Sequence, residues 1–185
     1  MTHTNRQSYL QFHIPLNLKS QWYRNLTAAI GGIRGIKWQQ GFFHITAAFI
    51  NNKIDVVEAE KVANLLGEEL GDITTPVITF DTLDAFITQG CGMYVIYLTA
   101  SQVPDEWSAL IEKLRSKLIV NGYQLGPYQM HITLARIPAQ STTLESLRNL
   151  MKQVDISGFS LPLRTADYRF YRDFSHAIRV YDYYQ

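Results

Sequence analysis

The sequence predicts a single bilobed domain of mixed helices and strands, built from two similar halves. Its 185 residues are many for one small domain and few for two independent ones. Strand-like and helix-like segments alternate in an order that occurs twice, over about residues 8–87 and 93–171. The tripeptide His-Ile-Thr stands at the same place in both halves, at residues 44–46 and 131–133. The repeated order and the repeated tripeptide together indicate an internal duplication.

The first half reads as strand, helix, strand, helix, strand. Asn17 and Asp55 are residue types that cap helices, while Gly71 is a typical stop. The polar Asp81 interrupts an apolar run and predicts an irregularity in the last strand. The five expected elements are a strand over 8–14, a helix capped by Asn17 and reaching Ile30, a strand over 42–50, a helix over 55–70 and a strand over 77–86.

The second half repeats this order and then adds one more strand. Thr142 with Glu145 fits a capping box, and Thr143 is the alternative cap for the same helix. The expected elements are a strand over 93–99, a helix over 105–120, a strand over 130–137, a helix to about Val154, and strands over 159–171 and 177–183.

Composition limits the classes of partner. A formal net charge of +1 argues against a protein that wraps long nucleic acid, which usually carries a clear basic excess. The end of an RNA or a small phosphorylated ligand fits this balance. Cys91 is the lone cysteine, no apolar run approaches the ~20 residues of a membrane span, and no targeting segment is visible. We expect a cytoplasmic monomer with no protein partner implied.

The repeated tripeptide predicts a site, because a strand directs residues i and i+2 to the same face. His44 with Thr46, and His131 with Thr133, each place one imidazole beside one hydroxyl. An isolated His-x-Thr is usually a strand histidine with a hydrogen-bond partner, but two copies half a chain apart favour a shared polar cleft. Strict alternation assigns to the opposite, apolar faces the residues Phe43, Ile45, Ala47 and Phe49 of the first strand and Met130, Ile132 and Leu134 of the second.

On these residues the chain resembles the two-histidine (2H) phosphoesterase superfamily, which includes 2′-5′ RNA ligase-like proteins and RNA 2′,3′-cyclic phosphodiesterases. Both signature motifs are present, at residues 44–47 and 131–134, and Trp38 and Arg136 also look like family features. The resemblance implies an α+β fold of two pseudo-symmetric lobes. Each lobe would hold an antiparallel sheet flanked by helices, and the lobes would face a central cleft that contains both motifs.

The resemblance also implies metal-independent hydrolysis of 2′,3′-cyclic phosphates, on RNA 3′ ends or small nucleotides, to 2′-phosphates. Histidine suits acid–base work near neutral pH. By analogy with the family, His44 is the general acid and His131 the general base, although the reverse assignment stays open. Thr46 and Thr133 would donate hydrogen bonds to the phosphate oxygens. No cofactor is implied, and no residue spacing typical of a metal site is present.

Four further residues are candidates for substrate binding. Arg136 stands five positions after His131, so strict alternation puts it on the wrong face unless a bulge or the end of the strand intervenes. Tyr128 is a candidate by its proximity to the motif. Arg169 and Tyr171 belong to a basic and aromatic run that suits a nucleobase and a phosphate, or equally a half-buried strand with solvated arginines.

Reverse 2′-5′ ligation uses the same catalytic groups and remains open. The alternative functions are a 2′-5′ oligonucleotide phosphodiesterase and a nucleotide-binding module with little turnover.

Overall fold

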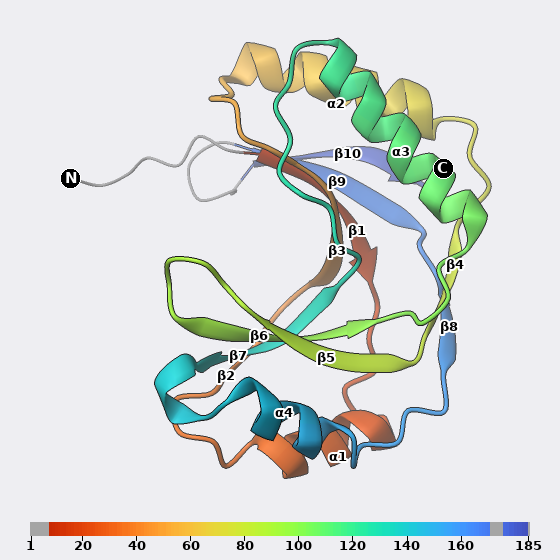
Figure 1. Ribbon diagram of the computed structural model, residues 1–185. Coiled ribbons are helices and arrows are strands. Elements are labelled where there is room, and N and C mark those ends of the chain that lie inside the picture. The colour runs from red at the N-terminus through yellow and green to blue at the C-terminus, as the bar shows by residue number, and fades with distance from the viewer. Residues whose placement is uncertain (1–7, 171–175, 185) are drawn as a thin grey trace.

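The computed structural model of the chain describes residues 8–170 and 176–184 (Figure 1). The helices are α1 (Gln21–Ile30), α2 (Val56–Leu70), α3 (Asp105–Val120) and α4 (Leu144–Met151), with a 3₁₀ turn at Ala139–Ser141. The strands are β1 (Ser8–Ile14), β2 (Lys37–Trp38), β3 (Phe43–Ile50), β4 (Val77–Phe80), β5 (Thr82–Ile87), β6 (Met93–Thr99), β7 (Ile132–Pro138), β8 (Phe159–Pro162), β9 (Thr165–Phe170) and β10 (His176–Asp182).

Two four-stranded sheets form the centre of the fold. Their strand orders are β10-β9-β1-β3 and β2-β7-β6-β5, and β4 pairs with β8 in a separate ladder. Every pairing between these strands is antiparallel. The α+β class with two antiparallel sheets is therefore confirmed. The sequence did not predict β2, which adds an edge to the second sheet, or the β4–β8 ladder.

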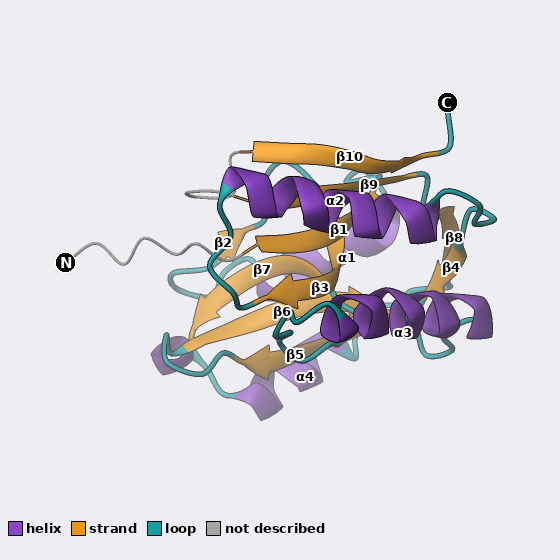
Figure 2. Ribbon diagram, turned by 90° about the horizontal axis from the view of Figure 1, so that it is seen from above, coloured by secondary structure: helices purple, strands orange, loops and turns teal. Residues whose placement is uncertain are grey.

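The helices lie in two pairs, one beside each sheet (Figure 1). α2 packs against α3 and β10, whereas α1 packs against α4, which contacts β5. Seen from above, in Figure 2, β10 lies at the edge of the first sheet beside α2. Each lobe thus takes elements from both halves of the sequence, because α1 and β5 join the second sheet while α3, β9 and β10 join the first. The duplication itself stays a prediction.

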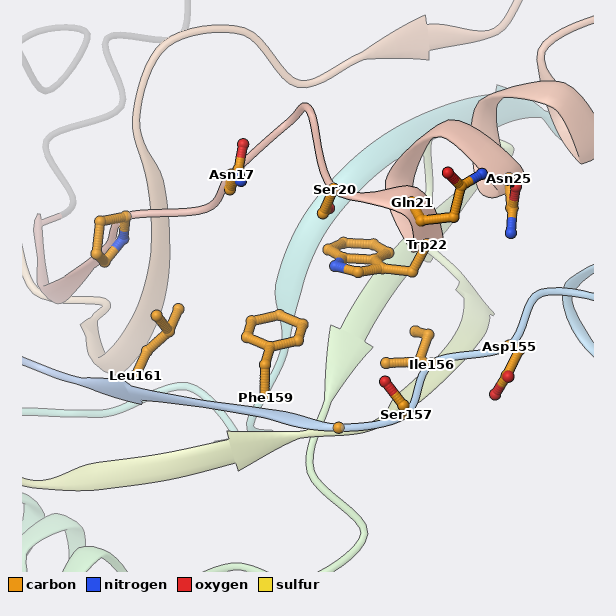
Figure 3. A pocket seen from close by; sticks show the side chains of 12 residues that line it. Asn17, Ser20, Gln21, Trp22, Asn25, Asp155, Ile156, Ser157, Phe159 and Leu161 are labelled. Atoms are coloured by element: carbon orange, nitrogen blue, oxygen red, sulfur yellow. Dashed lines mark hydrogen bonds between the residues drawn. The ribbon is translucent and has the colours of Figure 1, made fainter.

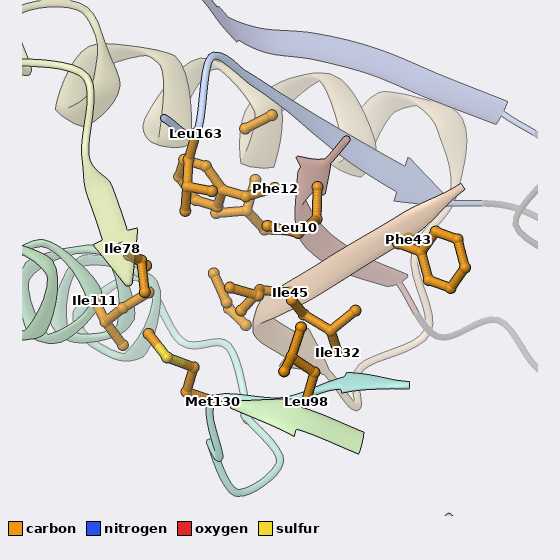
Figure 4. Close-up of a cluster of buried hydrophobic side chains, with 14 of the residues drawn as sticks. Leu10, Phe12, Phe43, Ile45, Ile78, Leu98, Ile111, Met130, Ile132 and Leu163 are labelled. Atoms are coloured by element: carbon orange, nitrogen blue, oxygen red, sulfur yellow. The ribbon is translucent and has the colours of Figure 1, made fainter. Parts of the chain in front are cut away.

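One apolar core connects the two lobes. Figure 4 shows Phe12 and Ile45 of the first sheet and Leu98 and Ile132 of the second, all of them fully buried. Phe12 also meets Trp107 of α3 edge to face, with ring centres 5.0 Å apart. Because this core joins both sheets, it sets the orientation of β3 relative to β7. β3 carries the first motif, and β7 begins directly after the histidine of the second.

Several expected element boundaries are corrected by the structure. Asn17 does not cap α1, which begins after Ser20; its side chain accepts a hydrogen bond from the Lys19 amide in the preceding turn. The strand expected over 77–86 divides at Asp81, where the chain passes from one ladder to another. The Asp81 carboxylate accepts hydrogen bonds from the Ser101 amide and hydroxyl, which hold this crossing in place.

Two predicted helix caps and the predicted C-terminal strands can also be compared with the structure. Asp55 accepts from the Glu58 amide, as predicted, and Thr143, not Thr142, accepts from the Ser146 amide. The strand expected over 159–171 is two strands, β8 and β9. Within the described part of the chain, no helix combines the length and the apolar character that crossing a membrane requires.

Candidate functional site

In both motifs a half-buried histidine and threonine flank a buried isoleucine. In β3, His44 and Thr46 are half-buried, while Ile45 between them is fully buried. His131 directly precedes β7, and it and Thr133 are half-buried on either side of the buried Ile132. The alternation predicted for the two tripeptides is therefore present in the structure, and each motif presents one imidazole and one hydroxyl on one face.

A β-bulge follows the threonine of each motif, at the same position. In the first sheet Leu10 faces Ala48 and Gln11 faces Thr46, so Ala47 has no partner across the ladder. In the second sheet Ile96 faces Ala135 and Tyr97 faces Thr133, so Leu134 is the extra residue. A bulge places two residues opposite one and reverses the alternation beyond it.

The bulges bring the fifth residue after each histidine to the motif face. Phe49 faces Tyr9, which lies two positions from the residue facing Thr46, so Phe49 shares the face of His44 and Thr46. Its assignment to the opposite face was wrong. By the same register Arg136 shares the face of Thr133. This arginine is exposed, and its Nη1 lies 3.5 Å from Oε1 of Gln39.

The two motifs approach each other across a cavity. Cα atoms of β3 and β7 come within 8 Å, and Thr46 and His131 line the same cavity of about 390 Å³. Within the described residues, neither Thr46 nor Thr133 has a hydrogen-bond partner for its hydroxyl. Both hydroxyls are therefore unengaged, but His44 and Thr133 are not among the residues that line this cavity.

Each imidazole is held by a hydrogen bond with the backbone two residues earlier. Nδ1 of His131 lies 2.9 Å from the carbonyl oxygen of Gln129, two residues earlier. Because a carbonyl only accepts, Nδ1 carries the proton, and the lone pair of the neutral ring is on Nε2. His44 makes its own hydrogen bond with the backbone of Phe42, again two residues earlier.

Burial makes both imidazoles weak bases. It lowers the pKa of His44 from 6.5 to about 4, against the hydrogen bond with Phe42; the charges of His131, His13 and Arg169 lower it further. Burial also lowers the pKa of His131, with a smaller contribution from the Arg136 charge and opposition from the Gln129 carbonyl. Both rings are therefore neutral in the free protein near pH 7.

Aromatic side chains enclose both rings. Tyr9 stacks on His44, with ring centres 5.8 Å apart and planes 25° apart. Phe86 and Tyr97 meet His131 edge to face, at 5.4 Å and 5.9 Å. These contacts exclude water from one side of each imidazole and account physically for the burial that lowers the pKa values.

A charged network lies beside His44 in the first sheet. His13 is directly opposite His44 in the ladder, and its Nε2 lies 2.8 Å from the Asp167 carboxylate, which also pairs with Arg179. Burial raises the pKa of Asp167, but the hydrogen bonds from Arg179 and His13 lower it by more. This pairing keeps a negative charge near the motif face of the sheet.

The remaining predicted binding residues divide into three cases. Tyr128 lines the cavity of the motifs, and its hydroxyl accepts a hydrogen bond from Nε1 of Trp107 at 2.8 Å. Arg169 faces Tyr9 across the ladder, so it lies on the same face as Phe49. Tyr171 lies outside the described residues. Tyr9 and Phe49 were missed because alternation alone did not place them at the site.

A second cavity, of about 500 Å³, lies between the start of α1 and residues 155–161 (Figure 3). Trp22 and Phe159 stack there with ring centres 5.7 Å apart. None of the four motif residues lines it. In the described part of the chain, no group of three or more His, Cys, Asp or Glu side chains is arranged to hold a metal ion.

No protein-family model matches the chain, and no curated protein matches it. Several solved structures match the chain over most of its length. E. coli LigT complexed with ATP is 21% identical over 94% of this chain and 95% of its own, with a TM-score of 0.58. Kluyveromyces marxianus Usb1 is 10% identical over 96% and 99%, with a TM-score of 0.65. The MHV ns2 PDE domain is 12% identical over 90% and 98%, with a TM-score of 0.57. The chain therefore shares the fold of these solved structures, as its resemblance to the two-histidine phosphoesterases implied.

Proposed function

We propose that this protein is a phosphodiesterase that hydrolyses 2′,3′-cyclic phosphates of RNA ends or small nucleotides to 2′-phosphates, without a metal ion. The observation that carries the proposal is the shared cavity: Thr46 of one motif and His131 of the other line the same space. Two imidazoles held by hydrogen bonds with the backbone, with two unengaged hydroxyls beside them, suit acid–base chemistry on one phosphate.

In the proposed reaction, water attacks phosphorus from the side opposite the 3′ oxygen. Nε2 of His131 takes a proton from that water as the P–O bond forms. His44 gives a proton to the 3′ oxygen as the P–O3′ bond breaks, which leaves the phosphate on the 2′ oxygen. Thr46 and Thr133 donate to the non-bridging oxygens, where charge develops. If a 5′-hydroxyl attacks in place of water, the P–O5′ bond forms, the P–O3′ bond again breaks with His44 protonating the 3′ oxygen, and the product is a 2′-5′ linkage.

The proton on His44 must arrive together with the substrate. Its pKa of about 4 in the free protein leaves the ring neutral near pH 7. A phosphodiester anion beside the ring favours the charged form and raises this pKa. Arg136 and Arg169, on the two motif faces, are proposed to hold the substrate through its phosphate or base, together with Tyr128 at the cavity wall and Tyr171.

The LigT structures with ATP, with 3′-AMP and with NADP⁺ support nucleotides as the class of ligand for this fold. We propose the same class for this chain. The second candidate within this class is a linear 2′-5′ oligonucleotide, cleaved by the same two imidazoles.

A phosphorus NMR time course tests the proposal, using nucleoside 2′,3′-cyclic phosphates and 2′-5′-linked dinucleotides. We expect a 2′-phosphate product from the cyclic substrates. His44→Ala and His131→Ala should each lower kcat/KM by about 10²- to 10⁴-fold. Arg24→Met, a change at an exposed position of α1, is the control. Turnover that survives both histidine substitutions, or binding without turnover of any substrate, would contradict the proposal.

A further inference from the structure

The cavity beside the motifs is larger than the reaction requires. Its volume of about 390 Å³ is within the range of small-molecule sites. Thr46 and His131 mark its catalytic end. The rest of its wall consists of Ala47, Ala48, Phe49, Asn51, Arg115 and residues 126–129. Apart from Tyr128, the proposed function assigns no role to the residues of this part of the cavity.

Arg115, from α3, brings a positive charge into the cavity. Its Nη2 donates to the Gly126 carbonyl oxygen at 2.8 Å, and its Cζ lies 6.0 Å from the centre of the Tyr128 ring. These contacts fix the plane of the guanidinium. Its Nη1 is buried and has no hydrogen-bond partner, and no carboxylate in the described part of the chain forms an ion pair with it.

A buried charged donor without an acceptor is costly, and the negative charge of an anion in the cavity that Arg115 lines would offset that cost. The planar guanidinium matches the oxygens of a phosphate group better than other cations do. The residues that line the cavity include no Asp or Glu, so a phosphate there meets no like charge. The half-buried ring of Phe49 offers apolar surface for the sugar or base next to it.

We propose that Arg115 binds a second phosphate group of the substrate, adjacent along the nucleotide chain to the phosphate held between the two histidines. This inference rests on the proposed function and sharpens its substrate class. The protein then selects an RNA end, or a nucleotide that also carries a 5′-phosphate, over a nucleoside 2′,3′-cyclic phosphate with a single phosphate.

Kinetics with three substrates measure this selection. They are a nucleoside 2′,3′-cyclic phosphate, the same compound with a 5′-phosphate, and a dinucleotide ending in a 2′,3′-cyclic phosphate. We expect the second phosphate to raise kcat/KM by about 10- to 100-fold, the range of a charged hydrogen bond. If kcat/KM rises for the compound with a 5′-phosphate, that group is the second phosphate. If it rises only for the dinucleotide, the second phosphate is the phosphodiester between its two nucleosides. The ratio should fall to about one in Arg115→Met, stay intermediate in Arg115→Lys and remain at the wild-type value in Arg24→Met.

Calorimetric titration separates this inference from the proposed function, because binding needs no turnover. The probes are adenosine 2′-monophosphate and adenosine 2′,5′-bisphosphate. We expect the wild type to prefer the bisphosphate by the same factor and Arg115→Met to bind both equally. Should Arg115→Met fail to fold by circular dichroism, Arg115→Lys carries the test with a reduced preference.

The possible outcomes distinguish the two claims. A bisphosphate preference that depends on Arg115, without turnover of any cyclic phosphate, supports the second phosphate site and counts against the proposed function alone. Equal affinities in the wild type, or a preference that persists undiminished in the Arg115 variants, overturn the second phosphate site.

Discussion

Replacing Tyr9 with alanine should raise the pKa of His44. Burial is the largest cause of the low pKa of this ring, and Tyr9 stacks on it with ring centres 5.8 Å apart. Alanine at position 9 would expose that side of the imidazole to water, which stabilises the protonated form. Phenylalanine keeps the stacked ring and removes only the hydroxyl, so it is the matched control.

The expected size follows from the pKa values. A change from 6.5 to about 4 favours the neutral ring by about 3 kcal/mol, at 1.36 kcal/mol for each pKa unit. Tyr9 covers one of the two faces of the imidazole. Its removal should therefore return part of the desolvation, and we expect the pKa of His44 to rise by about one unit.

A proton–carbon NMR titration of the His44 ring gives this pKa directly, and the spectrum of His44→Gln assigns the resonance. We expect a raised pKa in Tyr9→Ala and a value near that of the wild type in Tyr9→Phe. An unchanged pKa in Tyr9→Ala would refute the role of stacking in the desolvation. An equal rise in both variants would mean that the hydroxyl, not the ring, is responsible.

Three more measurements test other parts of the account. Because both imidazoles have lowered pKa values, kcat/KM for a 2′,3′-cyclic phosphate should peak between about pH 4 and 6.5; an optimum above pH 7 would contradict the two-histidine assignment. Urea unfolding should show stability falling as the pH drops from 6.5 toward 4, because the unfolded chain takes up a proton on His44 before the folded protein does. His44→Gln should lose less stability over that interval, and a loss as large as in the wild type would assign the effect to other groups. Thr143→Ala should lower the free energy of unfolding by about 1 kcal/mol, and Thr142→Ala by much less; equal losses would argue against the observed cap.

The sequence predicted that the histidine and threonine of each motif share one face of a strand, because alternation over a few residues is a local property. It could not predict the bulges at Ala47 and Leu134, since a bulge is defined by the register with a neighbouring strand. The consequence was an incorrect face for Phe49 and an undecided one for Arg136. The only sign of a bulge is one extra residue in one of two paired strands. This sign becomes visible once the pairing is known.

Arg115 shows the other limit of local patterns. On an amphipathic helix it is one solvated cation among several, and nothing in the α3 sequence separates it from Lys113 or Lys117. Those two lysines pair with carboxylates on α2, whereas Arg115 faces the cavity. The difference arises because α3 packs beside the first sheet, whereas β6, the strand before it, belongs to the second sheet. This placement is a property of the whole fold.

A crystal structure with a bound nucleoside 2′-phosphate tests the central claim most directly. We expect one phosphate group in contact with Nε2 of both His44 and His131 and with the hydroxyls of Thr46 and Thr133. A phosphate that contacts only one imidazole, with the other ring turned into a separate pocket, would contradict the two-histidine mechanism.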